Sequence, residues 1–428
     1  MRSAFVFAMT ALAVAAEPRT LTLSEALEQA SKLNPDVQVA RLRVLETEAD
    51  ASRTSAARQP QVGAIVAASY NTSSLQGIGV SVPGLSSRLG PYGLINARPA
   101  FTQTIVDAGL VSAIRAARER VTESRESAEA LRETILFAVT QLYVDALRAE
   151  ARAMAAERRI GIASAVLKQT SDRHAEGAAS KLDLARAEQQ AESERVVAKS
   201  ARRDAATLRS MLARVIGLDS GEDFSLQPPS SRMAEVPNQE TVESEAVSNR
   251  AELKALAARS RAASEDRAQA ARQRWPKVSA FGDFGFLGEN PARGVSTYSV
   301  GAALTLPLWT GGRIKAEVAG ASARLSQAQE EERKTRLQTK QEVRQALIEI
   351  EAARESEGVA KRAVKAARET LELARLRFSE GISTNLEATL AQRALADAEE
   401  ADIRVRFELL NGWARLARAR GDVASLLR

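Results

Sequence analysis

The second half of this sequence repeats the first, and this duplication constrains the fold more than any other feature. The segment "FTQTIVDAGLVSAIRAA" at 101–117 aligns with "LTLPLWTGGRIKAEVAG" at 304–320, an offset of 203 positions. Two glycine-centred segments, "RHAEGAASKLD" at 173–183 and "RFSEGISTNLE" at 377–387, align at an offset of 204. The chain is therefore one unit of roughly 200 residues written twice, and any predicted element should occur in both copies.

The first helix of each unit starts at a clear boundary signal. Asn34 can cap a helix and Pro35 suits its first turn, so the sequence predicts a helix from there to about Arg58. In the second unit, the matching helix should begin near Asn249 and end before Pro276.

A much longer helix follows in each unit. It is entered through Asp107 or Thr310 as the N-cap and extends over roughly 100 Å, at 1.5 Å per residue. A return helix of about 40 residues, or roughly 60 Å, then ends at Gly217 or Gly421. The two shorter helices of a unit together match the long one, so we expect them to lie beside it, stacked end to end.

Each glycine-centred segment is typical of a helical hairpin tip. Gly177 and Gly381 suit the left-handed residue that ends a helix. The residues that follow, Ser180–Asp183 and Thr384–Glu387, fit the capping box that starts the next helix. His174 stands just before the first tip, where a role in packing the tip is favoured over a role as a metal ligand.

Each unit also contains two segments with strand-like alternation. The segment "RQPQVGAIVAASY" at 58–70 aligns with "RWPKVSAFGDFGF" at 274–286, at an offset of 216 because the first copy has a longer loop. The strands are expected at about 61–71, 95–106, 277–287 and 296–308, lengths that suit tilted membrane strands. One predicted face is apolar, with Val62, Ala64, Val66, Ala68, Tyr70, Val278, Ala280, Phe284, Phe286, Tyr298, Val300, Ala302, Leu304 and Leu306. The other is small and polar, with Lys277, Ser279, Asp283, Thr297, Ser299, Gly301, Ala303 and Thr305.

Composition excludes several classes of protein. Of the 428 residues, 27% are charged and only 4% are aromatic, which is typical of long helices rather than of one large core. The net charge of +6 is spread along the helices as mixed-sign pairs, so nucleic acid is not an expected partner. There is no cysteine, and no phosphate-binding loop, metal-ligand cluster or catalytic triad is visible, so we expect no enzyme activity, cofactor or metal.

The N-terminus reads as an export signal. Arg2 is followed by the apolar stretch "AFVFAMTALAVAA" and a small-residue cleavage site, so residues 1–16 should be removed. No other segment approaches 18 continuous apolar residues. A chain like this one would cross a membrane with strands rather than helices.

Four strands are too few for one chain to close a barrel, because the smallest common membrane barrels need about eight. An open sheet edge is not viable in lipid, so copies of the chain must pool their strands. Two copies would supply eight strands and three would supply twelve. With a small, polar inner face, such a barrel would be a water-filled conduit.

The sequence resembles the outer-membrane efflux proteins typified by TolC. The resemblance rests on "LTLSEALEQASKLNPDVQVA" at 21–40, "LPLWTGGR" at 306–313, "RFSEGISTNLE" at 377–387 and the duplication itself. It implies a mostly α fold with a small membrane β part: a homotrimer whose 12-strand β-barrel continues as a periplasmic α-helical barrel. It also implies an exit duct for a tripartite efflux pump or a type I secretion system. The partners would be a periplasmic adaptor, an inner-membrane pump and outer-membrane lipid.

Domain boundaries follow from the repeats and this resemblance. The first repeat would span 17–217 and the second 241–428, with 218–240 as a linker in the equatorial region. Trp275, Trp309 and Tyr298, near the strand ends, are candidates for the membrane interface.

The resemblance also implies two kinds of site at the tips. Residues that would dock the adaptor are Gly177, Ala178, Ala179, Ser180, Gly381, Ile382 and Ser383. Asp183, Glu387 and Phe378 are candidates for a periplasmic gate, although Phe378 and Ser383 carry no charge that could lock it against Asp183. The alternative interpretation is a periplasmic coiled-coil adaptor or scaffold without a membrane barrel. It does not explain two membrane-length strand pairs.

Overall fold

The computed structural model describes residues 19–79, 84, 86–218, 224–229, 235–290 and 294–424, so the expected export signal lies outside the described residues. The chain divides into two compact units. The helical unit comprises Met1–Ala40, Ala128–Ala251 and Arg336–Arg428. The sheet unit comprises Arg41–Ser127 and Glu252–Thr335.

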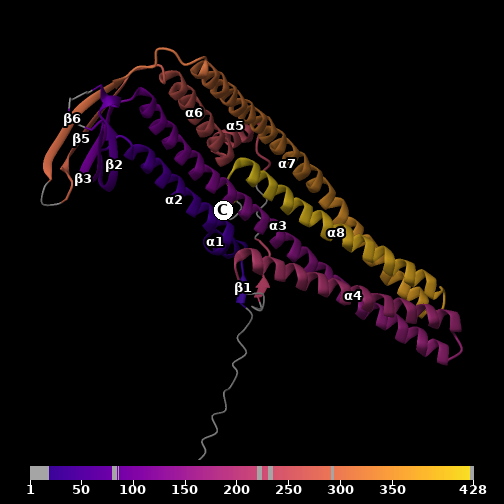
Figure 1. Ribbon diagram of the computed structural model, residues 1–428. Coiled ribbons are helices and arrows are strands. Elements are labelled where there is room, and N and C mark those ends of the chain that lie inside the picture. The colour runs from indigo at the N-terminus through magenta and orange to yellow at the C-terminus, as the bar shows by residue number, and fades with distance from the viewer. Residues whose placement is uncertain are drawn as a thin grey trace, which may run out of the picture. The chain divides into compact units, whose positions relative to one another are not determined.

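The sheet unit contains one antiparallel sheet of four strands. The strands are β2 (Gln61–Ser74), β3 (Arg88–Val106), β5 (Lys277–Gly288) and β6 (Val295–Thr305). They lie side by side in the order β2-β3-β5-β6, so each repeat supplies one hairpin and β3 joins β5 at the junction (Figure 1). Strands β2 and β6 are the two edges of this sheet.

The strand register confirms the two predicted faces. Val278 pairs with Leu304 and Phe284 pairs with Tyr298, so the apolar residues of the second hairpin share one face. On the other face Ser279 pairs with Ala303. Several large apolar residues interrupt that second face, among them Phe281 opposite Gly301, Ile65 opposite Arg98 and Leu287 opposite Val295.

The first-repeat strands are longer than expected, because β2 continues to Ser74 and β3 already begins at Arg88. In the second repeat, β6 ends at Thr305 rather than near 308. Pro307, two residues further on, has no N–H to donate to a ladder.

The start of the second long helix corrects a prediction. Asp107 caps α3 (Ala108–Ala175) as expected, accepting a hydrogen bond from Leu110 N at 3.0 Å. Thr310, however, does not cap α7 (Arg313–Ser379), which begins three residues later. Gly311 and Gly312 have φ of 58° and 85°, a left-handed conformation that the right-handed helix cannot include.

The sheet unit also contains α6 (Ala251–Arg272) and parts of α2 (Pro35–Ala56), α3 and α7. Ion pairs connect these helices in the order α2, α3, α6, α7. They are Glu48 with Arg125, Arg120 with Asp266, and Arg259 with Glu331, at 2.6–2.8 Å.

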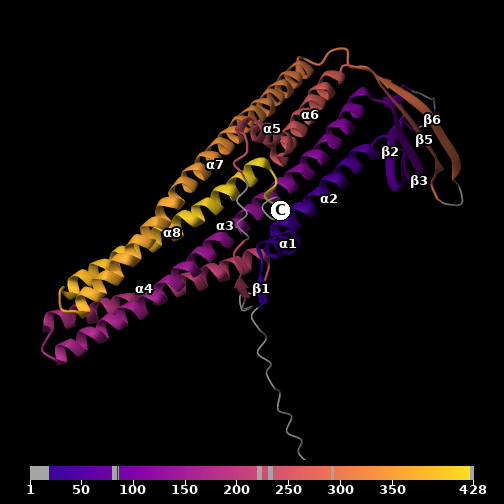
Figure 2. The same cartoon turned by 180° about the vertical axis from the view of Figure 1, so that it is seen from behind.

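The helical unit contains two helical hairpins and four short elements that the sequence interpretation missed. The first hairpin pairs α3 with α4 (Lys181–Ile216) and the second pairs α7 with α8 (Asn385–Arg420), as Figure 2 shows. The missed elements are β1 (Arg19–Leu21), α1 (Leu23–Leu33), β4 (Phe224–Leu226) and α5 (Gln239–Asn249).

The short helices stack end to end, as predicted. A Cβ on Gly217, just past α4, would lie 2.8 Å from Leu33 Cβ, and Asn34 Nδ2 donates to Val215 O at 2.9 Å. In the second repeat, a Cβ on Gly421 would lie 3.0 Å from Arg250 Cα. Helix α4 therefore ends against the start of α2, and α8 against the start of α6.

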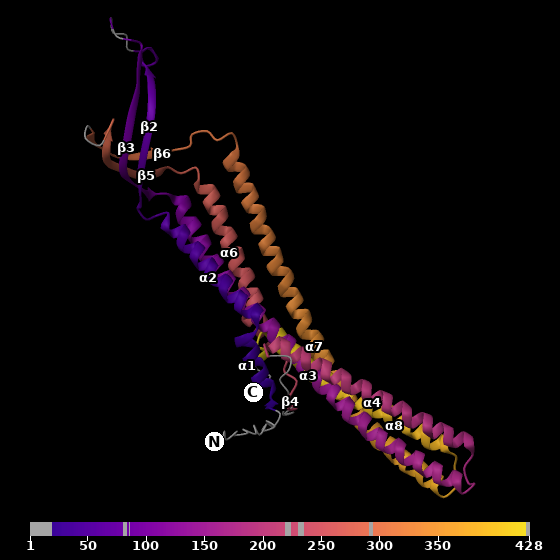
Figure 3. The ribbon, with the colours of Figure 1, turned by 60° about the horizontal axis from the view of Figure 1, so that its bottom comes forward.

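The helical unit has one small core centred on each repeat, and the first of these also includes Phe407 of α8. Helices α1, α3 and α4 pack with β1 and β4, and α5 packs with α7 and α8. Tyr143 of α3 is fully buried in the first core, where its hydroxyl lies 2.8 Å from Leu21 O and 2.6 Å from Gln227 O. It thereby ties the parallel pair β1–β4 to the long helix; β4 is labelled in Figure 3. None of the helices in the described residues combines the length and apolarity needed to cross a bilayer.

Candidate functional site: the two hairpin tips

The first hairpin tip is closed by a Schellman motif. Gly177 has φ of 75°, its N–H donates to His174 O at 3.0 Å, and Ala178 N donates to Arg173 O at 2.8 Å. A Cβ on Gly177 would meet nothing within 4 Å, so the positive φ alone makes glycine the suitable residue here.

The second tip repeats this geometry. Gly381 has φ of 77°, its N–H donates to Phe378 O at 3.2 Å, and Ile382 N donates to Arg377 O at 2.9 Å. Both glycines therefore end a helix as the sequence predicts.

The helices that follow the two tips begin differently, and this difference corrects one of the two predicted capping boxes. Ser180 Oγ accepts from Asp183 N at 3.1 Å, and Asp183 Oδ2 accepts from Ser180 N at 3.3 Å, so the first box is present. Thr384 makes no side-chain cap hydrogen bond, so the second box is absent. The carboxylate of Glu387 instead lies 3.8 Å from the guanidinium of Arg377.

A cluster that we call the tip clasp joins the two tips. The guanidinium of Arg173 stacks over the ring of Phe378, 4.9 Å from its centroid, and donates to the Phe378 carbonyl. The buried side chain of Asn385 donates through Nδ2 to the backbone oxygen of Asp183 at 2.9 Å. Each contact crosses from one repeat to the other.

His174 closes the first turn. Its Nδ1 lies 2.8 Å from Ala179 O, and a carbonyl can only accept, so this nitrogen carries the proton. Within the described residues, no group of three or more His, Asp or Glu side chains could hold a metal ion.

The structure places the predicted docking residues at the surface of the tips. Gly177, Ala178, Ser180, Gly381 and Ile382 are exposed. Ala179 and Ser383 are half-buried. Leu182 and Leu386 add exposed apolar surface close to these turns. The tips thus combine rigid turns with small and apolar side chains, which suits contact with another protein.

The three gate candidates are not equivalent. Phe378 is buried and belongs to the tip clasp, and Asp183 contributes its backbone oxygen to the clasp. The carboxylate of Asp183 caps α4, whereas that of Glu387 is exposed and paired with Arg377. Arg173 and Asn385 were not singled out in the sequence, because a single arginine or asparagine near a turn carries no distinctive signal.

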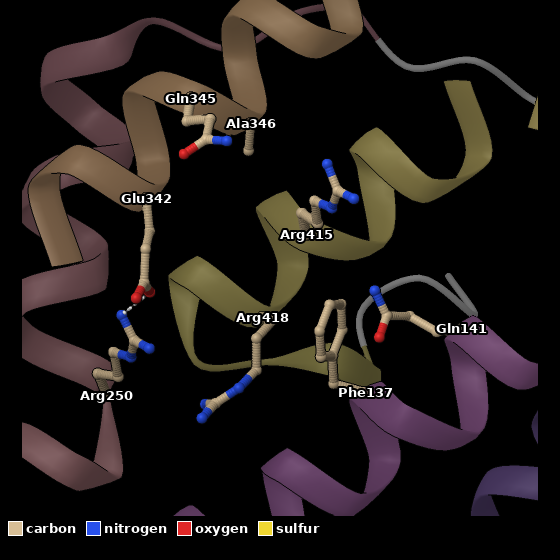
Figure 4. Close-up of a pocket in the computed structure, with 8 residues that line it drawn as sticks. All are labelled: Phe137, Gln141, Arg250, Glu342, Gln345, Ala346, Arg415 and Arg418. Atoms are coloured by element: carbon tan, nitrogen blue, oxygen red, sulfur yellow. Dashed lines mark hydrogen bonds and ion pairs between the residues drawn. The ribbon is translucent and has the colours of Figure 1, made fainter. Parts of the chain in front are cut away.

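A cavity of about 410 Å³ lies farther along the helical unit, between α3, α7, α8 and the start of α6 (Figure 4). Arg250 pairs with Glu342 and Arg415 with Glu349, while Arg418 donates to Thr134 at 2.9 Å. Each of these three guanidinium groups already has a protein partner. The cavity is a space between helices that is lined largely by polar side chains. Its lining residues are Phe137, Gln141, Arg250, Glu342, Gln345, Ala346, Arg415 and Arg418.

Three solved structures of membrane proteins share this fold. A membrane protein from Pseudomonas aeruginosa is 22% identical with a TM-score of 0.84, and the match covers 93% of both chains. The outer membrane protein VceC from Vibrio cholerae is 19% identical with a TM-score of 0.83, covering 94% of this chain and 96% of that one. The CmeC outer membrane channel of Campylobacter jejuni is 17% identical with a TM-score of 0.84, covering 94% of this chain and 88% of that one.

The sequence itself also matches a family model. The model describes outer membrane efflux proteins and matches residues 26–218 and 242–422, one segment in each repeat. No curated protein sequence matches the chain at a significant level. The matched segments cover most of the chain and include both tips and all four strands of the sheet. The chain therefore belongs to the outer membrane efflux protein family, and it is an outer-membrane channel with a helical extension into the periplasm.

Proposed function

We propose that the protein is the exit duct of a tripartite efflux pump and works as a homotrimer. Three copies of the four-stranded sheet form one 12-strand barrel in the outer membrane, and the helical hairpins continue it as a periplasmic tunnel. Cargo moves passively, driven by an inner-membrane pump to which a periplasmic adaptor connects the duct. The membership of the channel family favours this function over the alternative of an adaptor or scaffold.

The observation that carries the proposal is the sheet with two open edges. Strands β2 and β6 each have one paired neighbour within the chain. Their free backbone N–H and C=O groups cannot face hydrocarbon without a large desolvation cost. Pairing β6 of one copy with β2 of the next satisfies both edges, and a closed cyclic assembly does so for every copy.

The two faces of the sheet fit this assembly. The apolar face carries large exposed residues, including Val66 at 78% and Tyr298 at 78% exposure, and we assign it to the lipid. The face with Ser279, Ser299 and Thr297 then lines the lumen. Trp275 and Trp309 flank the strand ends that pair through Lys277 and Thr305, where they suit the membrane interface.

The tips are the proposed adaptor-docking site. Gly177, Ala178, Ala179 and Ser180 would meet the adaptor from the first tip, and Gly381, Ile382 and Ser383 from the second. Support comes from their rigid turns and from the exposed apolar side chain of Ile382.

The same end of the duct would hold the gate. Asp183 and Glu387 of three copies would place six carboxylates in a narrow ring that attracts cations. Asp183→Asn combined with Glu387→Gln should abolish cation selectivity in planar-bilayer recordings. Unchanged selectivity in a correctly assembled variant would leave Asp183 only its capping role.

Spin labels on β6 test the membrane assignment. Labels at Val300, Ala302 and Leu304 should be quenched by a lipid-soluble agent, because their face meets lipid. Labels at Ser299, Gly301 and Ala303 should be quenched by a water-soluble agent instead. If quenching does not alternate along β6, the sheet does not form the wall of a membrane barrel.

A further inference from the structure

One charged pair lies within the sheet, at the junction of the two repeats. Arg98 of β3 and Asp283 of β5 form an ion pair with Nη1 and Oδ1 2.7 Å apart. Arg98 Nε also donates to Asn96 Oδ1 at 2.6 Å, and Nη2 to Thr297 Oγ1 at 3.4 Å. The network spans β3, β5 and β6.

Beyond the first position of each strand, this pair holds the only charged residues of β2, β3, β5 and β6. Their other charged residues, Arg88 and Lys277, each occupy the first position of a strand. Asp283 pairs in register with Ser299, which places the network on the small, polar face of the sheet. The surrounding positions on that face are largely glycine, alanine, serine and threonine.

The backbone makes room for the arginine. A Cβ on Gly285 would lie 2.2 Å from Arg98 Cβ and 2.5 Å from Ala97 O, so only glycine fits opposite this side chain. Both charged groups nevertheless reach solvent, because the side chain of Arg98 is 22% exposed and that of Asp283 is 21% exposed. The pair is therefore presented at the surface of the polar face and is not sealed in a core.

We propose that the Arg98–Asp283 pair forms a charge-balanced ring in the barrel lumen that sets the local potential for passing ions and charged cargo. The proposal rests on the trimeric barrel proposed above, whose symmetry repeats the pair three times. Because every guanidinium is matched by a carboxylate, the ring favours neither cations nor anions. Removal of one partner leaves three unbalanced like charges on the lumen face of the barrel.

The absence of cysteine allows the local potential to be measured directly. Ser299→Cys introduces a single thiol beside the pair on the lumen face. Its modification rates by a cationic and by an anionic methanethiosulfonate reagent are measured in the membrane-embedded protein. The ratio of the two rates reports the potential, because the thiolate fraction affects both rates equally. The readout does not depend on whether the periplasmic gate is open.

Two neutralising variants should change this ratio in opposite directions. In the Ser299→Cys background, Arg98→Gln should raise the cation-to-anion ratio and Asp283→Asn should lower it. Each change should be on the order of three- to tenfold at 0.1 M salt, where screening reduces but does not remove the field of nearby charges. The double variant should return close to the starting ratio.

Controls separate charge from structure. Arg98→Lys keeps the charge and should keep the ratio. Lys277→Gln removes a charge about 20 Å along the strand, roughly two Debye lengths away, and should also leave the ratio unchanged. If the pair has a purely structural role, the two neutralising variants should not shift the cation-to-anion ratio in opposite directions. That result would overturn the inference.

A further thiol distinguishes failure of the inference from failure of the proposed function. Val300→Cys lies on the apolar face and should resist both membrane-impermeant reagents. If it reacts as readily as the thiol of Ser299→Cys, the barrel assignment itself is wrong. If the thiol at position 300 stays protected while neutralising Arg98 or Asp283 leaves the cation-to-anion ratio at position 299 unchanged, the barrel assignment stands and only the inference of a charge-balanced ring is wrong.

Discussion

Arg173 and Arg377 occupy equivalent positions in the two repeats, yet they bind different groups. Arg173 crosses to the second tip, where it meets Phe378, whereas Arg377 stays in its own hairpin and pairs with the exposed Glu387. A partly buried stacked and hydrogen-bonded arginine contributes about 1–3 kcal/mol, and an exposed ion pair contributes about 0–1 kcal/mol. The clasp, and not the ion pair, should hold the two tips together.

Substitution of these two arginines tests this difference. Arg173→Met should loosen the tips and raise single-channel conductance, because the clasp loses its stacking and its hydrogen bond. Arg377→Met is the matched control and should leave conductance near the value of the unmodified protein. Equal effects of the two substitutions would show that the clasp has no special part in closure.

Tyr143 gives a prediction with a defined pH range. Burial raises the pKa of its phenol from 10.0 to about 12, despite its hydrogen bond to Gln227. The folded state therefore retains this proton more tightly than the unfolded state does. The contribution of the protonated phenol to stability is complete below pH 10 and is lost as the pH rises toward 12. Tyr143→Phe should lower the free energy of unfolding at neutral pH by about 1–3 kcal/mol, because a buried backbone carbonyl loses its hydrogen-bond donor.

The measurement is chemical unfolding of both proteins across this pH range. The difference in stability between them should shrink above pH 10, because ionisation favours unfolding of the tyrosine-containing protein alone. A difference that stays constant to pH 12 would mean that the phenol is not buried as described.

At the scale of elements, the tip turns depend on two left-handed glycines. Gly177→Val and Gly381→Val should each strain a turn, because a β-branched residue resists positive φ at a cost of at least about 1–2 kcal/mol. Adaptor crosslinking and export should fall while the oligomer still assembles. Gly161→Ala, in the interior of α3 where a Cβ meets nothing within 4 Å, is the control and should leave export intact. Normal export by a variant that carries both Gly177→Val and Gly381→Val would argue against docking at the tips.

Several elements could be predicted because their signals are local. The glycine turns, the Asn34-Pro35 helix start and the alternating faces of β5 and β6 each follow from neighbouring residues. Helix α1 had such a signal that was missed, since Thr22 and Glu25 form a full capping box. The short strand β4 had none, because three residues in a loop reveal nothing until their partner β1 is known.

The tip contacts mark the limit of sequence reasoning. Thr384–Glu387 has the residues of a capping box, but Arg377 binds the carboxylate that would complete it. Likewise, the repeat alignment treats Arg173 and Arg377 as equal, because it contains no information about contacts between the repeats. The Arg98–Asp283 pair joins residues that are 185 positions apart, and only the strand order brings them together.

The whole molecule, as proposed here, is a closed ring of three chains. A cyclic assembly would pair the two free edges of each sheet, and three chains of four strands would supply the twelve strands of the proposed barrel.

Native mass spectrometry of the protein extracted from outer membranes in mild detergent measures the number of chains directly. We expect one main species of three chains, each close to the 46.0 kDa of the full sequence less its export signal. Mixing with a mass-tagged version during synthesis should give four species, with zero to three tagged chains. A main species of one, two or four chains would contradict the proposed 12-strand barrel.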